Sequence, residues 1–381
     1  MNLEPPPGFP NKPNRKINFE EFLAKSWEGF SQKSQLSQAE IMHPAVSQCL
    51  SGILDDAPTL SSSSEFDAST LDVSGNLSAL PSLCRTKNGS KRVQQIIAKS
   101  RPEEIDKIIQ ALLTDVAELM CDVYGNYMCQ TLFQSCSSAH RVVLLQAMEN
   151  KLVKISQDGR GTHSLQTLIS LANLPQEEAV YKSAFTGHIY RLSTHANATH
   201  VIQRLLVTFK NSHFIIREIM GRVKELAMDK LGLCVIKKCV NDPQVFTELT
   251  SDPMMLMQDP YGNYAMQHLI DTWREECSFQ MINAMKGRCA QLSIQKYSSN
   301  VMEKCMKEEK MRHAIVNEFI QEEKLPLLLN CPYGCYVLRT SALESEPLLR
   351  NKLRTAISEI IPQLHQKKLK ARWDEILNSL S

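Results

Sequence analysis

The sequence predicts an all-α solenoid, a row of short helical units stacked on one another. One observation is a near duplication, because Asp122 to Gln130 reads DVYGNYMCQ and Asp259 to Gln267 reads DPYGNYAMQ. Another is composition: the 381 residues are 43% hydrophobic but contain only 14 Gly, which favours helices over a turn-rich β-fold. A third is a small residue that recurs before a helix at an almost constant spacing.

The period of the repeat is set by glycine, or a residue in its place, at the start of a helix. Successive positions differ by 36, 36, 37, 34, 30, 36 and 36 residues, which predicts eight units. The positions are Gly89, Gly125, Gly161, Ala198, Gly232, Gly262, Ser298 and Gly334. In each unit a short apolar segment precedes a polar turn, a helix and a second amphipathic helix. The 30-residue step predicts a shortened last helix or loop in the fifth unit, around Asn241 to Pro253.

Three regions follow from these patterns. Residues 1–80 are expected to be a mostly disordered region of low complexity, because Pro, Asn, Gln and Ser are frequent there. Within it, Pro5 to Phe9 reads PPPGF and resembles the proline-rich ligands of GYF-type adaptor domains, although a solvated tail explains the same residues. The repeats are expected to occupy residues 81–365, and residues 366–381 to form a helical cap or tail.

The charge distribution and the cysteine content limit the range of possible functions. The net charge is +2, yet of the 43 basic and 41 acidic residues, 6 and 10 lie in residues 1–85 and 37 and 31 in residues 86–381. A basic surplus in the repeats suits a phosphate-bearing partner, and it also suits ordinary solvated surface. The 12 Cys form no CxxC pair, which predicts packing thiols, no metal or cofactor, and a reducing, cytoplasmic location. No apolar run reaches 18 residues and no signal-peptide pattern appears, so we expect no membrane segment.

The helix that begins at Asn126 has two distinct faces. At about 100° of turn per residue, Asn126, Tyr127 and Gln130 fall on one polar and aromatic face that the core does not need. The side chains of Met128 and Leu132 fall on the opposite, apolar face. Amides one turn apart can pair with the edge of a nucleobase, and an adjacent ring can stack between bases. Repeated at roughly 10 Å between packed helices, this face could bind an extended single strand.

These units resemble the PUF (Pumilio-homology) repeats, and the resemblance covers roughly residues 80 to 365. It implies a right-handed crescent of eight three-helix repeats with capping pseudo-repeats. It also implies a monomer whose concave face binds single-stranded RNA antiparallel, so that the last repeat reads the 5′ end. Binding to 3′ untranslated regions, with repression or decay through a deadenylase complex and translational repressors, is the implied role.

In each repeat the resemblance implies two side chains that read the base edge and one that stacks between bases. Adenine is implied for repeat 1, uracil for repeats 2 and 6, and guanine for repeat 7, where a carboxylate suits the N1 and N2 donors. Thr in repeats 3 and 4 leaves adenine and uracil poorly separated. The edge readers are Ser90 and Gln94, Asn126 and Gln130, Thr162 and Gln166, Thr199 and Gln203, Asn263 and Gln267, Ser299 and Glu303, and Cys335 and Arg339. The stacking residues are Lys91, Tyr127, His163, His200, Tyr264, Asn300 and Tyr336.

Repeats 5 and 8 depart from the family pattern. In repeat 5, Leu233 and Cys234 supply neither an edge bond nor an aromatic stack, so the repeat tolerates any base or lets one turn away while Lys237 meets a phosphate. In repeat 8, Arg339 presents donors to an acceptor-rich edge such as cytosine O2 and N3. The implied site is 5′-(C/U)-G-U-N-(A/U)-(A/U)-U-A-3′.

Other interpretations compete with this one. An aspartate before each glycine turn could suggest carboxylate catalysis, but N-terminal helix capping explains it better. The aspartates are Asp122, Asp158, Asp229 and Asp259. A protein-binding scaffold like armadillo or HEAT arrays, or an RNA-shape binder like the ribosome-assembly relatives of the family, are alternative functions. An enzyme is not expected, because no nucleophile and base pair, metal spacing or phosphate-binding glycine loop is present.

Overall fold

The structure is a computed structural model that describes residues 77–321, 323–364, 370–371, 373–374 and 377. The chain divides into two units, Met1–Glu65 and Phe66–Ser381, and only the second contains described residues. The PPPGF segment therefore lies outside the described residues. All regular structure within these ranges is helical, which confirms the predicted fold class.

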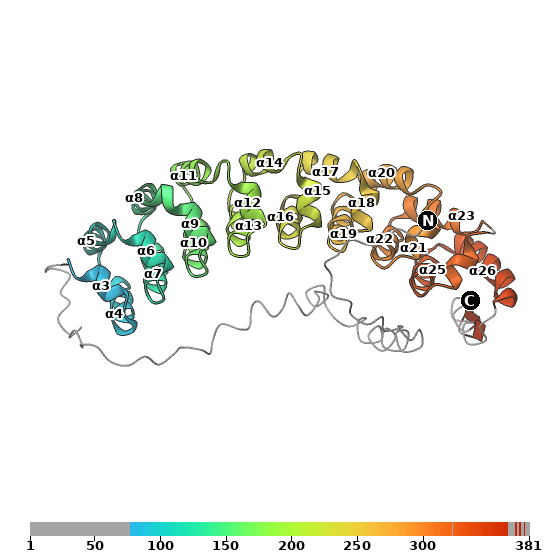
Figure 1. The fold of residues 1–381 in the computed structure, drawn as a ribbon, viewed down its shortest axis with the longest axis horizontal. Coiled ribbons are helices and arrows are strands. Elements are labelled where there is room, and N and C mark those ends of the chain that lie inside the picture. Colours follow the sequence, from blue (N-terminus) through green and yellow to red (C-terminus); the bar gives the residue numbers. More distant parts are fainter. Residues whose placement is uncertain (1–76, 322, 365–369, 372, 375–376, 378–381) are drawn as a thin grey trace, which may run out of the picture. The chain divides into compact units, whose positions relative to one another are not determined.

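Taken by itself, the second unit repeats three helices in a fixed order, which we call the short, inner and outer helices (Figure 1). The short helices are α3 (Leu80–Cys84), α6 (Val116–Cys121), α9 (Leu152–Gln157), α12 (Ile189–Ser193), α15 (Val223–Met228), α18 (Pro253–Met257), α21 (Cys289–Ser293) and α24 (Leu325–Leu329). The inner helices are α4 (Lys87–Ile97), α7 (Gly125–Ser135), α10 (Gly161–Ser170), α13 (Ala198–Thr208), α16 (Gly232–Cys239), α19 (Gly262–Trp273), α22 (Ser298–Cys305) and α25 (Pro332–Glu344). The outer helices are α5 (Pro102–Leu112), α8 (Ser138–Met148), α11 (Pro175–Phe185), α14 (His213–Ile219), α17 (Pro243–Thr250), α20 (Glu275–Met285), α23 (Glu309–Phe319) and α26 (Pro347–Ile360). Two 3-10 helices, η2 (Glu149–Lys151) and η3 (Ile361–Gln363), complete the described elements.

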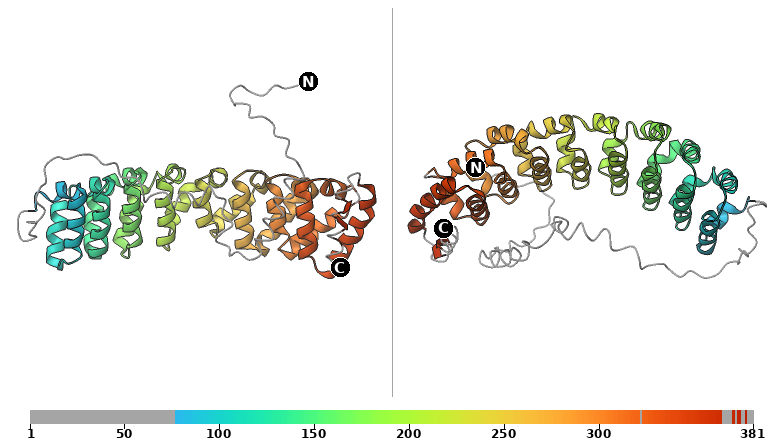
Figure 2. Two further views of the ribbon diagram at one scale, coloured as in Figure 1. Left: turned by 90° about the horizontal axis from the view of Figure 1, so that it is seen from below. Right: turned by 180° about the vertical axis from the view of Figure 1, so that it is seen from behind.

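The inner helices lie side by side along the concave side of this unit, and the outer helices follow its convex side (Figures 1 and 2). The core lies between them. In the second repeat, Met128 and Phe133 of α7 and Leu144 of α8 are all 0% exposed. Each repeat buries its apolar stripe only by packing on its neighbours, which is why the row is stable as a stack.

The glycine that starts an inner helix is required by close packing on the preceding short helix. A Cβ on Gly125 would lie 2.7 Å from the Leu119 carbonyl oxygen, and one on Gly262 would lie 2.6 Å from that of Leu256. Real Cβ atoms do not approach backbone oxygen so closely. Repeats 4 and 7 carry Ala198 and Ser298 at this position, and Ser298 Oγ donates a hydrogen bond of 2.7 Å to the Leu292 carbonyl.

The aspartates before the glycines cap the inner helices, as predicted. Asp259 Oδ1 accepts hydrogen bonds from the backbone N–H groups of Tyr261 and Gly262, both at 2.8 Å. Asp122 makes the same pair of bonds in repeat 2. These contacts satisfy N–H groups that have no partner inside the helix. A structural role thus accounts for the recurring carboxylate.

On three of the outer helices, a glutamate accepts hydrogen bonds from backbone N–H groups around the start of the short helix of the same repeat. Glu218 accepts from the N–H groups of Gly187 and Ile189, and Gly187 has a φ of 81° that favours glycine. Glu248 and Glu318 make the corresponding bonds in repeats 5 and 7. These hydrogen bonds could not be predicted from the sequence, because the partners are about thirty residues apart and meet only when the helices pack.

The fifth repeat is shortened, as the 30-residue step predicts, and the shortening affects both α16 and α17, which have 8 residues each. Trp273 of α19, in the sixth repeat, packs against the shortened fifth repeat. Its indole Nε1 donates to the Val240 carbonyl at 2.8 Å, and its ring lies 4.6 Å from that of Phe246. The next repeat therefore supplies the apolar volume that the fifth one lacks.

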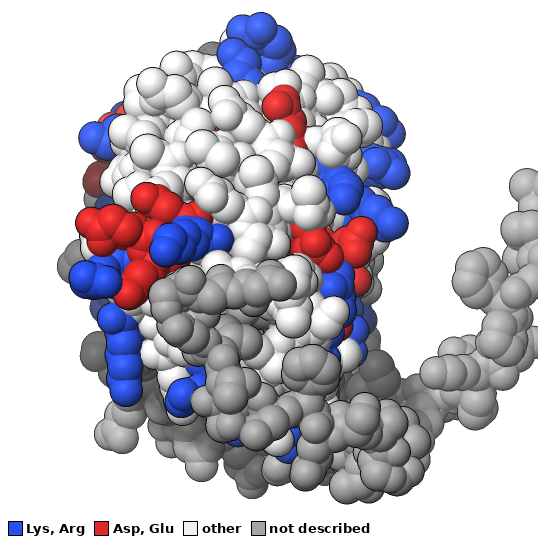
Figure 3. Space-filling view, turned by 90° about the vertical axis from the view of Figure 1, so that its left-hand side faces the viewer, with Lys and Arg blue, Asp and Glu red and all other residues white. Residues whose placement is uncertain are grey.

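The end of the row that carries the first repeat bears acidic and basic side chains around an uncharged centre (Figure 3). At the opposite end, Trp373 and Leu377 are buried although they lie beyond the last complete outer helix. Among the described residues, no helix is long and apolar enough to cross a membrane.

Candidate nucleic-acid interface

Three positions of each inner helix carry the sequence-predicted residues, and we call them the first edge, stacking and second edge positions. In every repeat except the fifth and eighth, the first edge side chain is buried, the stacking side chain is exposed and the second edge side chain is half-buried. The same pattern recurs because each inner helix packs on its neighbours with the same face. The structure thus brings the sequence-predicted residues into one row on the concave side.

Burial of the first edge position corrects one expectation, that the core does not need this side chain. Asn126 is only 5% exposed, and its Nδ2 donates to the carbonyls of Asp122 at 2.8 Å and Val123 at 3.0 Å. Asn263 makes the equivalent two bonds in repeat 6. Both amide hydrogens are therefore used to close the turn, and Oδ1 is the atom that faces the row.

Hydroxyl groups at the first edge position link neighbouring repeats. Ser90 Oγ donates to the Tyr124 carbonyl at 2.7 Å, Thr162 Oγ1 to the Asn197 carbonyl at 3.1 Å and Thr199 Oγ1 to the Leu231 carbonyl at 3.5 Å. Each acceptor lies just before the inner helix of the following repeat. A side chain predicted only to read a base therefore also holds two repeats together.

Glutamine at the second edge position is oriented by the first edge position. In five repeats its Nε2 donates to the side-chain oxygen one turn earlier. Gln166 Nε2 also contacts the Thr162 carbonyl, and Gln130 Oε1 also contacts Thr167. The bonds run from Gln94 to Ser90 at 3.1 Å, Gln130 to Asn126 at 3.4 Å, Gln166 to Thr162 at 3.2 Å, Gln203 to Thr199 at 3.2 Å and Gln267 to Asn263 at 3.1 Å. The result is a preorganised donor and acceptor pair in each of these repeats.

The stacking position offers exposed rings in two of the three tyrosine repeats. Tyr127 is 56% exposed and Tyr264 is 48% exposed, values high for large aromatic side chains. Tyr336 differs: it is half-buried, and its hydroxyl is buried without a hydrogen-bond partner in the described part of the chain. The ring of repeat 8 is therefore less available for stacking than its sequence register suggests.

The remaining stacking residues are exposed polar side chains, namely Lys91, His163, His200 and Asn300. The His200 ring is partly desolvated although the residue is exposed, and this desolvation, followed by the charge of His163, lowers the pKa of His200 below its usual value. Its imidazole is therefore neutral at neutral pH, and a neutral ring stacks on a base without carrying charge.

Repeat 5 has neither a ring nor an edge acceptor in the row. Leu233 is 8% exposed, Cys234 is half-buried, and burial raises the pKa of the Cys234 thiol. Lys237 is exposed, while its backbone carbonyl lies 3.2 Å from His268 Nε2 in repeat 6. Whether this repeat tolerates any base, or lets one turn away while Lys237 meets a phosphate, stays a prediction.

Repeat 7 presents the carboxylate of Glu303 at the second edge position, where five of the repeats present a glutamine amide. Burial raises the pKa of Glu303 above its usual value, and the Thr340 hydroxyl and the charges of Lys307 and Arg339 act in the opposite direction. Arg339, the predicted cytosine reader of repeat 8, thus also lies close enough to act on Glu303. Ser299 is buried, with Oγ 3.5 Å from the Lys296 carbonyl.

Three thiols of the inner helices, those of Cys129, Cys239 and Cys305, belong to the core. Cys129 and Cys305 are 0% exposed, and burial raises the pKa of both. Cys335 in repeat 8 is half-buried, with Sγ 3.3 Å from the Leu329 carbonyl. Within the described ranges, no group of three His, Cys, Asp or Glu side chains could hold a metal ion.

Sequence reasoning missed the residue that directly follows the second edge position. Thr167 Oγ1 lies 3.3 Å from Gln130 Oε1, and Thr340 Oγ1 lies 3.3 Å from Glu303 Oε2, in each case across to the preceding repeat. Aligning the repeats would have shown this column, but its residue types vary too much to suggest a role. Only the packing of adjacent helices shows what they contact.

Comparison with known proteins finds similar repeats in other proteins. The sequence model of the Pumilio-family RNA binding repeat (PUF) matches residues 81–113, 115–148, 188–220, 222–242, 254–285 and 288–320. Pumilio homolog 12 of Arabidopsis thaliana is 30% identical over 304 residues, which cover 75% of this chain and 51% of that protein. A Pumilio domain-containing protein of Schizosaccharomyces pombe is 29% identical over 322 residues, 82% of this chain and 47% of that protein. The chain spans about half the length of these relatives.

Solved structures show the same fold. The Puf4 RNA binding domain, bound to a 3′ UTR recognition sequence of HO endonuclease RNA, has a TM-score of 0.72 and 27% identity, covering 77% of this chain and 97% of that chain. The RNA-binding domain of yeast Puf5p, bound to SMX2 RNA, has a TM-score of 0.70 and 22% identity, covering 81% and 99%. The second likeness concerns the fold alone.

The fold and the row define a helical-repeat protein with a regular array of polar and aromatic side chains on its concave side. The repeat matches and the relatives then identify it: the chain belongs to the PUF family. The repeat number of eight stays a prediction, because the family model matches six segments and leaves out α9–α11 and α24–α26.

Proposed function

We propose that this chain binds single-stranded RNA with sequence selectivity through the row of edge and stacking positions. The observation that carries the proposal is the recurring environment of these positions, with an exposed stacking side chain between two oriented polar ones. Single-stranded RNA can splay its bases to match such a row, whereas a duplex cannot. The RNA-bound Puf4 domain, similar over 77% of this chain, supports the same assignment.

The proposed site is 5′-(C/U)-G-U-N-(A/U)-(A/U)-U-A-3′, with repeat 8 at the 5′ end. Glu303 accepts from guanine N1–H and N2–H, and Gln130 and Gln267 each pair with a uracil. Repeat 5 makes no selection because Leu233 offers no polar atom to a base edge. The order of bases follows from the order of these repeats along the row.

The proposed role is regulation of messenger RNA by binding 3′ untranslated regions in the cytoplasm, with repression or decay through a deadenylase complex and translational repressors. The relatives' RNA-bound structures support the class of ligand, since the Puf4 RNA is a 3′ UTR sequence. The free thiols of the described chain suit a reducing compartment. The protein would act as a monomeric binding protein without catalysis.

Selection of bound RNAs from a random pool tests the function and the base order together. We expect the full chain to enrich sequences with G-U near the 5′ end and U-A at the 3′ end, with no preference at the fourth base. A pool that enriches no motif would support the alternative of a protein-binding scaffold. Enrichment of hairpins without a shared sequence would support a shape binder.

Replacing Tyr127 by alanine is expected to weaken binding of the selected RNA by about 1 to 3 kcal/mol, because one base loses its stacking partner. Binding is measured by fluorescence anisotropy. Phe279 provides the matched control, since it is 73% exposed but lies on outer helix α20, and Phe279→Ala should leave RNA affinity unchanged. Equal losses for both variants would contradict stacking on the concave side.

A further inference from the structure

Adjacent inner helices contact each other at the residue after the second edge position, which we call the following position. In repeat 8 this residue is Thr340 of α25, and its Oγ1 donates to Glu303 Oε2 of α22 at 3.3 Å. In repeat 3 it is Thr167 of α10, and its Oγ1 lies 3.3 Å from Gln130 Oε1 of α7. A hydroxyl from one repeat thus reaches the base-reading oxygen of the repeat before it.

The Thr340 contact is the stronger of the two. In the described part of the chain, the Thr340 hydroxyl has no other acceptor and the Glu303 carboxylate no other hydrogen-bond donor. Thr167 has a single hydroxyl hydrogen that also points to the His163 carbonyl at 3.1 Å. A hydrogen bond to a charged oxygen is worth about twice a bond between neutral groups.

The carboxylate of Glu303 needs an orienting partner. It is half-buried, and although the charges of Lys307 and Arg339 act on it, no ion pair among the described residues includes Glu303. Lys304, the next residue, pairs with Asp271 of the preceding repeat instead. Without Thr340 the carboxylate could turn about its side-chain bonds, and guanine requires both of its oxygens at once, one for N1–H and one for N2–H.

We propose that a hydroxyl at the following position that reaches the second edge side chain of the preceding repeat is a positioning residue for the base read by that repeat. Thr340 holds Glu303 for guanine and Thr167 holds Gln130 for uracil, so that two repeats jointly set one base. This inference rests on the proposed RNA binding and adds residues outside the edge and stacking positions.

Two repeats of this chain allow an internal comparison. Repeats 2 and 6 have the same three reading residues, and in both the glutamine Nε2 donates to the asparagine Oδ1. The glutamine of repeat 2, Gln130, contacts the hydroxyl of Thr167 in repeat 3. The corresponding residue for repeat 6 is Lys304 in repeat 7, which pairs with Asp271 instead. Both Nε2 and Oε1 of Gln130 therefore make side-chain contacts, whereas only Nε2 of Gln267 does. Uracil selectivity should be stricter at repeat 2.

The test compares two RNAs, 5′-CGUAAAUA-3′ and the same sequence with adenine at the second base. The proteins are the full chain, Thr340→Val, Thr340→Ser and Thr131→Val. Thr131 is the matched control, because it occupies the following position of repeat 2 but donates only to the Tyr127 carbonyl of its own helix. Affinities come from fluorescence anisotropy, and thermal melts monitored by circular dichroism check folding.

We expect Thr340→Val to bind the guanine RNA about 5- to 20-fold more weakly and the adenine RNA unchanged, because one hydrogen bond to a charged group is lost. Thr340→Ser should restore the preference for guanine, and Thr131→Val should behave as wild type. A merely structural Thr340 would change both affinities together, and that result overturns the inference.

Two other results separate the inference from the function on which it rests. If wild type prefers guanine and Thr340→Val keeps that preference in full, the inference alone is wrong. If wild type binds the two RNAs equally, the proposed reading of guanine by repeat 7 is wrong and the inference falls with it.

Discussion

A chain with alanine at both Ser299 and Glu303 is expected to lose about 1 to 3 kcal/mol, or roughly 5- to 150-fold in affinity, for RNA with guanine at the second base. The loss arises because the guanine N1–H and N2–H groups leave water without finding acceptors. An RNA with adenine in place of that guanine should lose much less. Titration of both RNAs measures the difference, and equal losses on the two would rule out base reading at this repeat.

The same carboxylate makes guanine binding depend on pH. Because burial raises the pKa of Glu303, its charged form is lost at a higher pH than in an exposed glutamate. Guanine needs the charged form, so the preference for guanine should be complete above the raised pKa and fall as the pH decreases through it. Glu303→Gln should bind without this pH dependence. A wild-type preference that stays constant as the pH falls would show that Glu303 does not carry the reading.

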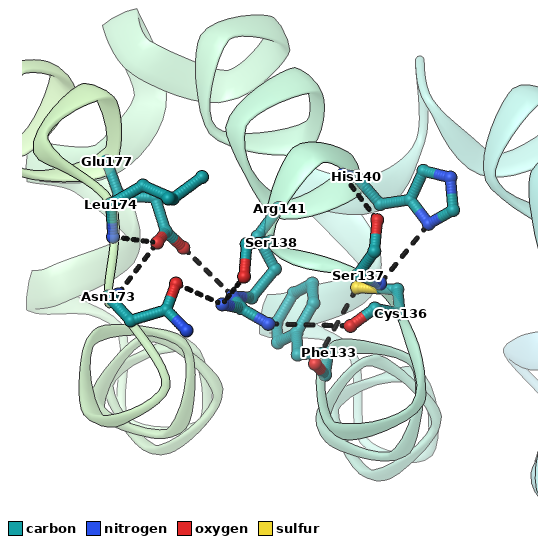
Figure 4. Close-up of polar contacts among 9 residues, drawn as sticks. All are labelled: Phe133, Cys136, Ser137, Ser138, His140, Arg141, Asn173, Leu174 and Glu177. Atoms are coloured by element: carbon teal, nitrogen blue, oxygen red, sulfur yellow. Dashed lines mark hydrogen bonds and ion pairs between the residues drawn. The ribbon is translucent and has the colours of Figure 1, made fainter.

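Glu177→Ala is expected to destabilise the solenoid by about 3 to 5 kcal/mol, because it leaves a buried guanidinium without its partner. The side chains of Arg141 on α8 and Glu177 on α11 are 7% and 0% exposed and lie 2.9 Å apart (Figure 4). The same carboxylate also accepts from the N–H groups of Asn173 and Leu174. Removing Glu177 thus breaks an ion pair and uncaps the outer helix of the third repeat.

Urea unfolding followed by circular dichroism measures this loss, and hydrogen exchange around α8 and α11 locates it. Glu178→Ala is the matched control, since Glu178 is a neighbour on the same helix whose side chain makes no hydrogen bond or ion pair in the described chain, and its loss should stay within about 0.5 kcal/mol. The pair Arg141→Met and Glu177→Leu should be less destabilised than Glu177→Ala, because no charge remains buried. A double variant as unstable as the single one would show that the lost cap, not the buried charge, dominates.

Prediction from the sequence worked where a property repeats along the helix. The fixed spacing from Gly125 to Gly161 and the polar and apolar faces of α7 are local patterns with a period, and each has one structural solution. The capping role of Asp122 was also accessible, because its partners lie two and three residues away. The register of the candidate interface follows from the same periodicity.

What the sequence by itself determined is therefore the helical solenoid, its period and the residues that face its concave side. Only the tertiary structure decided that Asn126 is buried and committed to its turn, that Tyr336 is partly covered, and that Thr340 reaches Glu303. The physical reason is distance along the chain. Thr340 and Glu303 are separated by 37 residues, so their contact depends on how one repeat packs on the next. Period and amphipathicity identify the row, and packing between repeats decides which atoms in it are free to bind.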